Sequence, residues 1–201
     1  TLGSITPAAT GTLLVGKSSG SSGTATITST SGTLANGIYG GRMVYFNGTA
    51  NTGYDWATTA SAGPVYTISG LGSYTTLPTS GGSSTVNYNM TASTTLSGGF
   101  SVNTLRMAPA TVNNVALDLG GNTLTVEGGG LLFTGSGTGN VINNGNVTAG
   151  VGSNYKLLIH NYNSQFHNTA ANNSGINAAI TDNGLNPVAV VVTGNPGGTS
   201  G

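Results

Sequence analysis

Short bursts of apolar and β-branched residues run along the whole chain, and turn-forming residues separate nearly all of them. Clear examples are TLLVG, RMVYF, PVYTIS, VALDLGG, NTLTVEGG and VAVVVTG. Gly, Asn, Ser and Pro stand at the boundaries, where they favour turns. Alternation inside the bursts, as at Leu124 and Val126, is typical of half-buried strands, and no convincing helical periodicity lies between them. The pattern predicts an all-β fold.

The spacing of the bursts predicts how the strands are arranged. Leu105, Leu131 and Leu157 each begin a burst at intervals of about 26 residues, close to one turn of a β-solenoid. We therefore expect stacked rungs of short strands over residues 91–201. Residues 42–90 hold most of the aromatic side chains and break the regularity, so we expect an irregular insertion or a flattened sheet there, after a first section at 1–41.

The low charge of the chain excludes several classes of function. Only 4% of its residues are charged, where about a quarter is ordinary. Nucleic-acid binding needs Lys and Arg to replace counterions along the phosphates, and the chain offers only Lys17, Arg42, Arg106 and Lys156. No apolar run reaches the roughly 20 residues that span a bilayer. We predict neither a nucleic-acid partner nor a membrane span in this segment.

One long passage of the sequence and several shorter segments resemble a known family. GTLLVGKSSGSSGTATITSTSGTLANGIYGG looks like the end of a repeat, in which a G-T-L-x-V strand, a Gly/Ser turn and a final G-T-L follow one another. GYDWATT, GLGSYTTLP, FSVNTLRM and the passage ALDLGGNTLTVEGGG are similar to segments between such repeats. The chain thereby resembles the passenger regions of autotransporter-type bacterial surface proteins with autotransporter-associated β-strand repeats.

This resemblance covers nearly the whole chain and carries its own expectations. It implies a right-handed parallel β-helix displayed outside the cell, on the bacterial surface. It implies a shared scaffold with no catalytic residues. The 201 residues would then be one β-helical segment of a longer extracellular chain, with 1–41 as the end of a repeat.

One motif points elsewhere, towards nucleotides. Gly11, Gly16, Lys17 and Ser18 fit the phosphate-binding pattern G-x-x-x-x-G-K-[ST]. That pattern needs a loop followed by a helix whose N-terminus faces the phosphates. Here the supposed loop, TLLV, is itself a good strand, and SSGSSG follows the lysine and cannot begin a stable helix. We interpret the match as a product of Gly-rich repetition.

The few titratable residues do not form a recognisable catalytic or metal-binding pattern in the sequence. Asp118 and Glu127 flank a Gly-Asn turn, and a glycosidase would need such a pair with separated pKa values. Asp118 stands between two leucines and Glu127 precedes a glycine run, which favours solvated structural positions. His160 and His167 lack a nearby Asp, Glu or Cys that would complete a metal site. We predict no catalytic, cofactor-binding or metal-binding residue.

The aromatic residues are the most promising interaction surface. They are Tyr39, Tyr45, Phe46, Tyr54, Trp56, Tyr66 and Tyr74. Such side chains either stack on sugars and protein partners or fill a core. If they form a surface, we expect Tyr54, Trp56, Tyr66 and Tyr74 to carry it.

Two functions remain open from the sequence. The first is a structural or adhesive β-helix segment, a stalk or a fibre that self-associates or continues a longer solenoid. The near-zero charge favours this function because copies do not repel one another. The second is a carbohydrate-binding or carbohydrate-active module that uses the aromatic residues on surface glycans.

Overall fold

The computed structural model of the chain describes residues 3–5, 11–17, 26–30, 32–49, 52–60, 63–110, 113–136, 139–163 and 174–194. These residues form short strands and, apart from them, one turn of 3₁₀ helix, η1 (Val151–Ser153). The strands belong to four sheets, three of which are entirely parallel. The predicted all-β class is confirmed.

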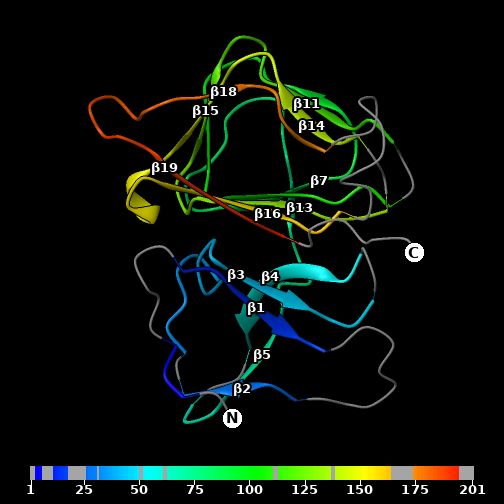
Figure 1. Cartoon of the computed structure of the whole chain (residues 1–201), viewed down its shortest axis with the longest axis vertical. Coiled ribbons are helices and arrows are strands. Elements are labelled where there is room, and N and C mark those ends of the chain that lie inside the picture. Colours follow the sequence, from blue (N-terminus) through cyan, green and yellow to red (C-terminus); the bar gives the residue numbers. More distant parts are fainter. Residues whose placement is uncertain are drawn as a thin grey trace.

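Six strands form the largest parallel sheet, which we call the long sheet. In spatial order they are β19 (Ala189–Gly194), β16 (Lys156–Asn161), β13 (Gly130–Phe133), β10 (Thr104–Met107), β7 (Asn87–Met90) and β6 (Thr75–Thr76). Every neighbouring pair is parallel. The long sheet is one side of a three-sided body (Figure 1).

Two four-stranded parallel sheets form the other sides. The second sheet is β17 (Gly175–Ile176), β14 (Val141–Asn143), β11 (Ala116–Asp118) and β8 (Thr94–Thr95). The third sheet is β18 (Ala179–Ile180), β15 (Asn146–Ala149), β12 (Thr123–Val126) and β9 (Phe100–Val102). The chain visits the three sheets in a constant order, from β7 to β8 to β9, then from β10 to β11 to β12, and so on. One passage through the three sheets, three strands long, is called a circuit.

Inward-facing side chains of the circuits stack into rows that form the main core. In the long sheet one row contains Tyr88, Leu105, Leu131 and Ile159. Burial of each aliphatic side chain stabilises the fold by about 1.5–3 kcal/mol. The expected spacing holds for Leu105 and Leu131, but Leu131 pairs with Ile159 and not with Leu157. The chain makes the turn η1 before β16, which lengthens that circuit.

The two ends of the three-sided body differ. At the first end, residues 77–86 cover the core: Leu77 and Val86 pack against it, and the amide of Ser83 donates to the Tyr88 hydroxyl at 3.2 Å. At the last end, β19 is an edge strand of the long sheet. Its side chains Val190 and Val192 continue the inner face of β16 but remain 45% and 65% exposed. We call this surface the open end.

The remaining strands form a mixed sheet. Its spatial order is β1 (Leu13–Gly16), β3 (Met43–Phe46), β4 (Tyr54–Thr59), β5 (Tyr66–Gly70) and β2 (Thr28–Ser29). β1 and β3 are parallel, and the other neighbours are antiparallel. The strand expected at TLLV is therefore present as β1. Of the section 42–90, the strands β3, β4 and β5 lie in the mixed sheet, whereas β6 and β7 belong to the long sheet.

The mixed sheet lies beside the outer face of the long sheet (Figure 1). Ile38, Val44 and Trp56 form a core cluster there with Leu132 and Tyr162, whose side chains come from β13 and from the end of β16. This second, smaller core joins the two parts of the molecule.

Candidate functional site

The site begins with a row of side chains on the outer face of the long sheet. Successive residues of a strand point to opposite faces, so the neighbours of the inward-facing row point outward. The outward row that the register aligns is Thr76, Asn89, Arg106, Leu132, His160 and Thr193. The row presents a cation, an aliphatic side chain and a histidine to the mixed sheet.

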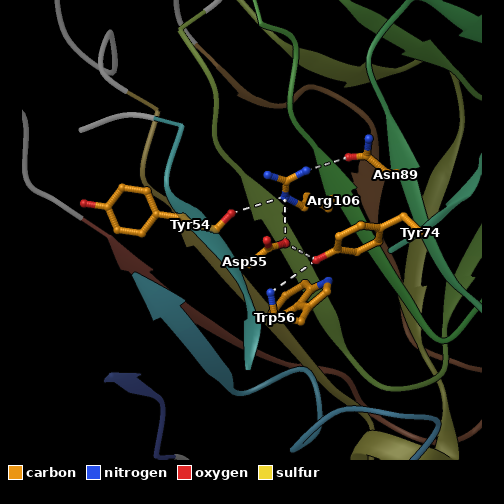
Figure 2. Close-up of polar contacts among 6 residues, drawn as sticks. All are labelled: Tyr54, Asp55, Trp56, Tyr74, Asn89 and Arg106. Carbon is orange, nitrogen blue, oxygen red and sulfur yellow. Dashed lines mark hydrogen bonds and ion pairs between the residues drawn. The ribbon is translucent and has the colours of Figure 1, made fainter. Parts of the chain in front are cut away.

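Arg106 is the centre of a polar cluster between the two sheets (Figure 2). Its Nε donates to the Tyr54 carbonyl at 3.2 Å and lies 3.4 Å from the Asp55 carboxylate. Its Nη1 donates to the side chain of Asn89 at 3.2 Å, and its guanidinium carbon lies 5.2 Å from the centre of the Tyr74 ring. Arg106 thus links β10 to its neighbour β7 and to β4 of the mixed sheet.

Tyr74 completes the cluster from the connection between the two parts. Its hydroxyl donates to the Asp55 carboxylate and accepts the amide of Trp56 at 3.3 Å. Burial raises the pKa of Tyr74 above its ordinary value, and the adjacent Asp55 carboxylate raises this pKa further. Tyr74 is therefore neutral, and its hydroxyl serves as a hydrogen-bond donor to Asp55. The cluster binds two sheets together by charge-assisted hydrogen bonds.

Farther along the outward row, His160 packs against Trp56 of the mixed sheet and forms a second contact between the two sheets. The Nε2 of His160 donates to the Gly41 carbonyl at 2.9 Å, and the two rings meet edge to face with centres 5.5 Å apart. Burial lowers the pKa of His160 to about 4, because water no longer solvates the charged form. Its Nδ1 and the Nε1 of Trp56 are buried and have no hydrogen-bond partner among the described residues.

An aromatic stack flanks this pair. The ring of Tyr54 lies between those of Phe46 and Tyr162, with centres 4.5 and 4.2 Å away. Tyr162 in turn lies 6.4 Å from His160 in a stacked orientation. Such pairs add about 0.5–1.5 kcal/mol each to the burial of their surface. The stack joins β3 and β4 to the end of β16.

Two glycines allow the close approach of the sheets. A Cβ on Gly130 would lie 2.7 Å from the Gly41 Cα and 2.7 Å from the Trp56 ring. A Cβ on Gly41 would lie 2.4 Å from the Gly128 carbonyl oxygen. Neither position accommodates a side chain without displacement of the mixed sheet.

The structure places three of the four predicted interaction residues together. Tyr54, Trp56 and Tyr74 all contact this junction, whereas Tyr66 lies on β5 opposite β2. Trp56 is completely buried, so its ring is not available for stacking on a ligand. Tyr54, Tyr66 and Tyr74 are half-buried.

The other residues considered from the sequence have ordinary surroundings or lie outside the described residues. Asp118 accepts the amide of Gly120 at 2.8 Å and the side chain of Asn144 at 3.1 Å, which stabilises its turn. Asp118 lies on β11 in the second sheet, and Glu127 follows β12 in the third sheet. Lys17 follows β1 and is half-buried. Ser18 and His167 lie outside the described residues.

Arg106, His160 and Tyr162 were missed as members of the site. The only sequence signal for Arg106 was its rarity, since the chain has four basic and four acidic residues. For His160 the sequence favours a hydrogen-bonded or surface histidine over a metal ligand, but it does not indicate the partner. Nothing local in the sequence indicates that these residues lie opposite β4.

Neither a metal centre nor a membrane helix is found in the described part of the chain. No group of three or more His, Cys, Asp or Glu side chains lies close enough there to hold an ion. No helix among those residues has the length and apolar character needed to cross a bilayer. Comparisons with protein-family models, curated proteins and solved structures find no match to this chain.

Proposed function

We propose that this chain is a structural or adhesive segment of an extracellular protein on a bacterial surface. Its three parallel sheets are the sides of a right-handed β-helix, which serves as a stalk or as the unit of a self-assembling fibre. The motif resemblance to autotransporter passenger regions supports the location and the handedness. The stacked parallel circuits and the low charge support a passive scaffold.

The observation that carries this proposal is the contrast between the two ends of the three-sided body. Residues 77–86 cover the first end, while the open end leaves Val190 and Val192 exposed on the edge strand β19, which pairs with β16 on one side and with no other strand among the described residues. An edge strand with exposed apolar side chains recruits another chain. Growth of the β-helix past β19, by a further rung or by another copy, buries this surface.

The other partner surface is β1, one of the two edge strands of the mixed sheet. β1 pairs in parallel with β3, and Leu13 and Leu14 are 40% and 46% exposed. A copy whose β19 pairs with β1 of the next copy joins two different surfaces. Such a heterologous contact does not close on itself unless its rotation forms a ring, so it builds a fibre.

Sedimentation of two charge-blocked variants tests this assembly. Val190→Lys with Val192→Lys blocks β19, and Leu13→Lys with Leu14→Lys blocks β1. We expect the unchanged chain to form larger species as its concentration rises. Each blocked variant is monomeric alone, and an equal mixture of the two forms heterodimers, because each supplies the edge that the other lacks.

Val65→Lys is the matched control, since Val65 is 47% exposed and precedes β5 in the mixed sheet. This variant assembles like the unchanged chain. A chain that stays monomeric at high concentration in both low and high salt contradicts self-assembly.

A carbohydrate-binding module, the alternative from the sequence, has no comparable support. Trp56 is the best sugar-stacking candidate by residue type, and its ring is completely buried between the two sheets. We therefore propose the scaffold function alone.

A further inference from the structure

The junction between the mixed sheet and the long sheet contains a buried histidine at its centre. His160 projects from β16 on the outer face of the long sheet, is 1% exposed, and contacts Trp56 and Gly41 of the mixed-sheet part. The mixed sheet therefore covers the imidazole. Separation of the two parts would return that ring to water.

The hydrogen bond of His160 decides where an added proton goes. A carbonyl oxygen only accepts, so the bond to Gly41 requires that Nε2 carries the hydrogen of the neutral ring. A second proton binds at Nδ1, which is buried without a partner among the described residues. The charged ring would gain no hydrogen bond that offsets its desolvation.

The charged and titratable groups around the junction do not compensate a positive ring. On the elements packed against it they are Arg42, Tyr45, Tyr54, Asp55, Tyr74 and Arg106, and its own strand and the residue after it add Lys156 and Tyr162. The one carboxylate in this set, that of Asp55, is already held by Arg106 and Tyr74. Arg106 stands on the same outward row two strands away, at about 10 Å by strand spacing.

We propose that the contact between the mixed sheet and the long sheet is a pH-sensitive latch. Protonation of His160 at Nδ1 drives Gly41 and Trp56 off the outer face of the long sheet, and the three-sided body stays folded. Release exposes the outward row of Asn89, Arg106, Leu132 and His160 as a new surface.

Linkage gives the direction and size of the effect. The pKa of His160 is about 4 in the latched form and returns towards 6.5 when the ring is solvated. The released form therefore binds more protons between these values. The latch has its full strength above pH 6.5 and weakens as the pH falls, by about 160-fold at pH 4 and by up to about 300-fold at still lower pH.

The single tryptophan of the chain reports on the latch directly, since Trp56 lies in the junction. We titrate the full 201-residue chain from pH 7.5 to 4 and record tryptophan emission and far-ultraviolet circular dichroism. We expect the emission to shift to the red below pH 6.5 while the β-sheet signal is unchanged. Histidine NMR follows both imidazoles through the same titration, and we expect His160 to titrate below the ordinary range.

The variant His160→Gln keeps a side-chain N–H for the Gly41 carbonyl and cannot acquire charge. We expect it to abolish the red shift, whereas His167→Gln, the matched control, preserves it. A red shift of equal size in His160→Gln overturns the proposal. Loss of the β-sheet signal together with the emission change also overturns it, because the acid would then unfold the whole chain. If His160→Gln fails to fold, the NMR titration decides alone. A His160 that titrates at or above pH 6.5 in the latched protein overturns the proposal.

Discussion

Asp55 and Arg106 are rare residue types in this chain, and the fold brings them together. The chain has four acidic and four basic residues, and these two meet 3.4 Å apart and mostly buried, with the Tyr74 hydroxyl on the same carboxylate. Partly buried charges without such partners are costly. The cluster therefore contributes specificity to the position of the mixed sheet, because other positions would leave Asp55 or Arg106 unpaired.

Tyr74→Phe tests the cluster at this scale. The substitution removes a hydroxyl that donates to Asp55 and accepts the Trp56 amide, so both groups lose a partner in the junction. We expect the free energy of unfolding to fall by about 1–3 kcal/mol. Urea denaturation measures the change.

Tyr155→Phe is the control, since the Tyr155 hydroxyl makes no hydrogen bond with a described residue, and its effect should stay within about 0.5 kcal/mol. Equal stability of Tyr74→Phe and the unchanged chain would mean that the hydroxyl does not hold the sheets together.

The sequence identified part of this site and not the rest, for a physical reason. Tyr54, Trp56 and Tyr74 stand out as clustered aromatic residues, but core and surface roles use the same residue types. Their partners Arg106 and His160 lie on other strands, 52 and 119 positions from the backbone groups that they bind. The alternation of apolar and polar residues along a strand indicates which face of the sheet a side chain lies on, but it does not indicate which other sheet packs against that face.

At the scale of elements, close approach of β13 to Gly41, two residues before β3, positions the mixed sheet. Gly130 lies at the start of β13, and Gly41 precedes β3. The absence of a side chain at both positions lets the Trp56 ring rest over β13. The contact explains why a glycine begins a strand that is otherwise rich in Leu and Phe.

Gly130→Ala tests this contact. The new methyl group would overlap the Gly41 backbone and the Trp56 ring, and overpacking of this kind costs about 1–3 kcal/mol. We expect red-shifted tryptophan emission already at neutral pH. Gly98→Ala is the matched control because a Cβ there meets nothing within 4 Å. Unchanged emission in Gly130→Ala would show that β13 does not contact Gly41 and Trp56 this closely.

The elements also show where spacing arguments succeed. The bursts containing Leu105 and Leu131 pair in adjacent strands, as their interval predicts. The next pairing moves two residues, from Leu157 to Ile159, because the turn η1 precedes β16. Turns between strands lie outside the core and tolerate insertions, so the length of a circuit varies while the inward row persists.

At the scale of the whole molecule, the three-sided body and the mixed sheet have different structural roles. The three-sided body supplies a repetitive parallel core, and the mixed sheet covers one outer face of it (Figure 1). The edge strands β1 and β19 carry exposed apolar side chains, while residues 77–86 cover the opposite end of the core. This distribution of covered and uncovered ends is the physical basis of the fibre proposal.

Electron microscopy of the full chain at high concentration, near pH 7, tests that claim most directly. We expect elongated assemblies of the unchanged chain, and isolated particles when Val190 and Val192 are replaced by lysine. Fibres that form equally well with both valines replaced would contradict assembly through β19. Isolated particles of the unchanged chain at every concentration would contradict self-assembly itself.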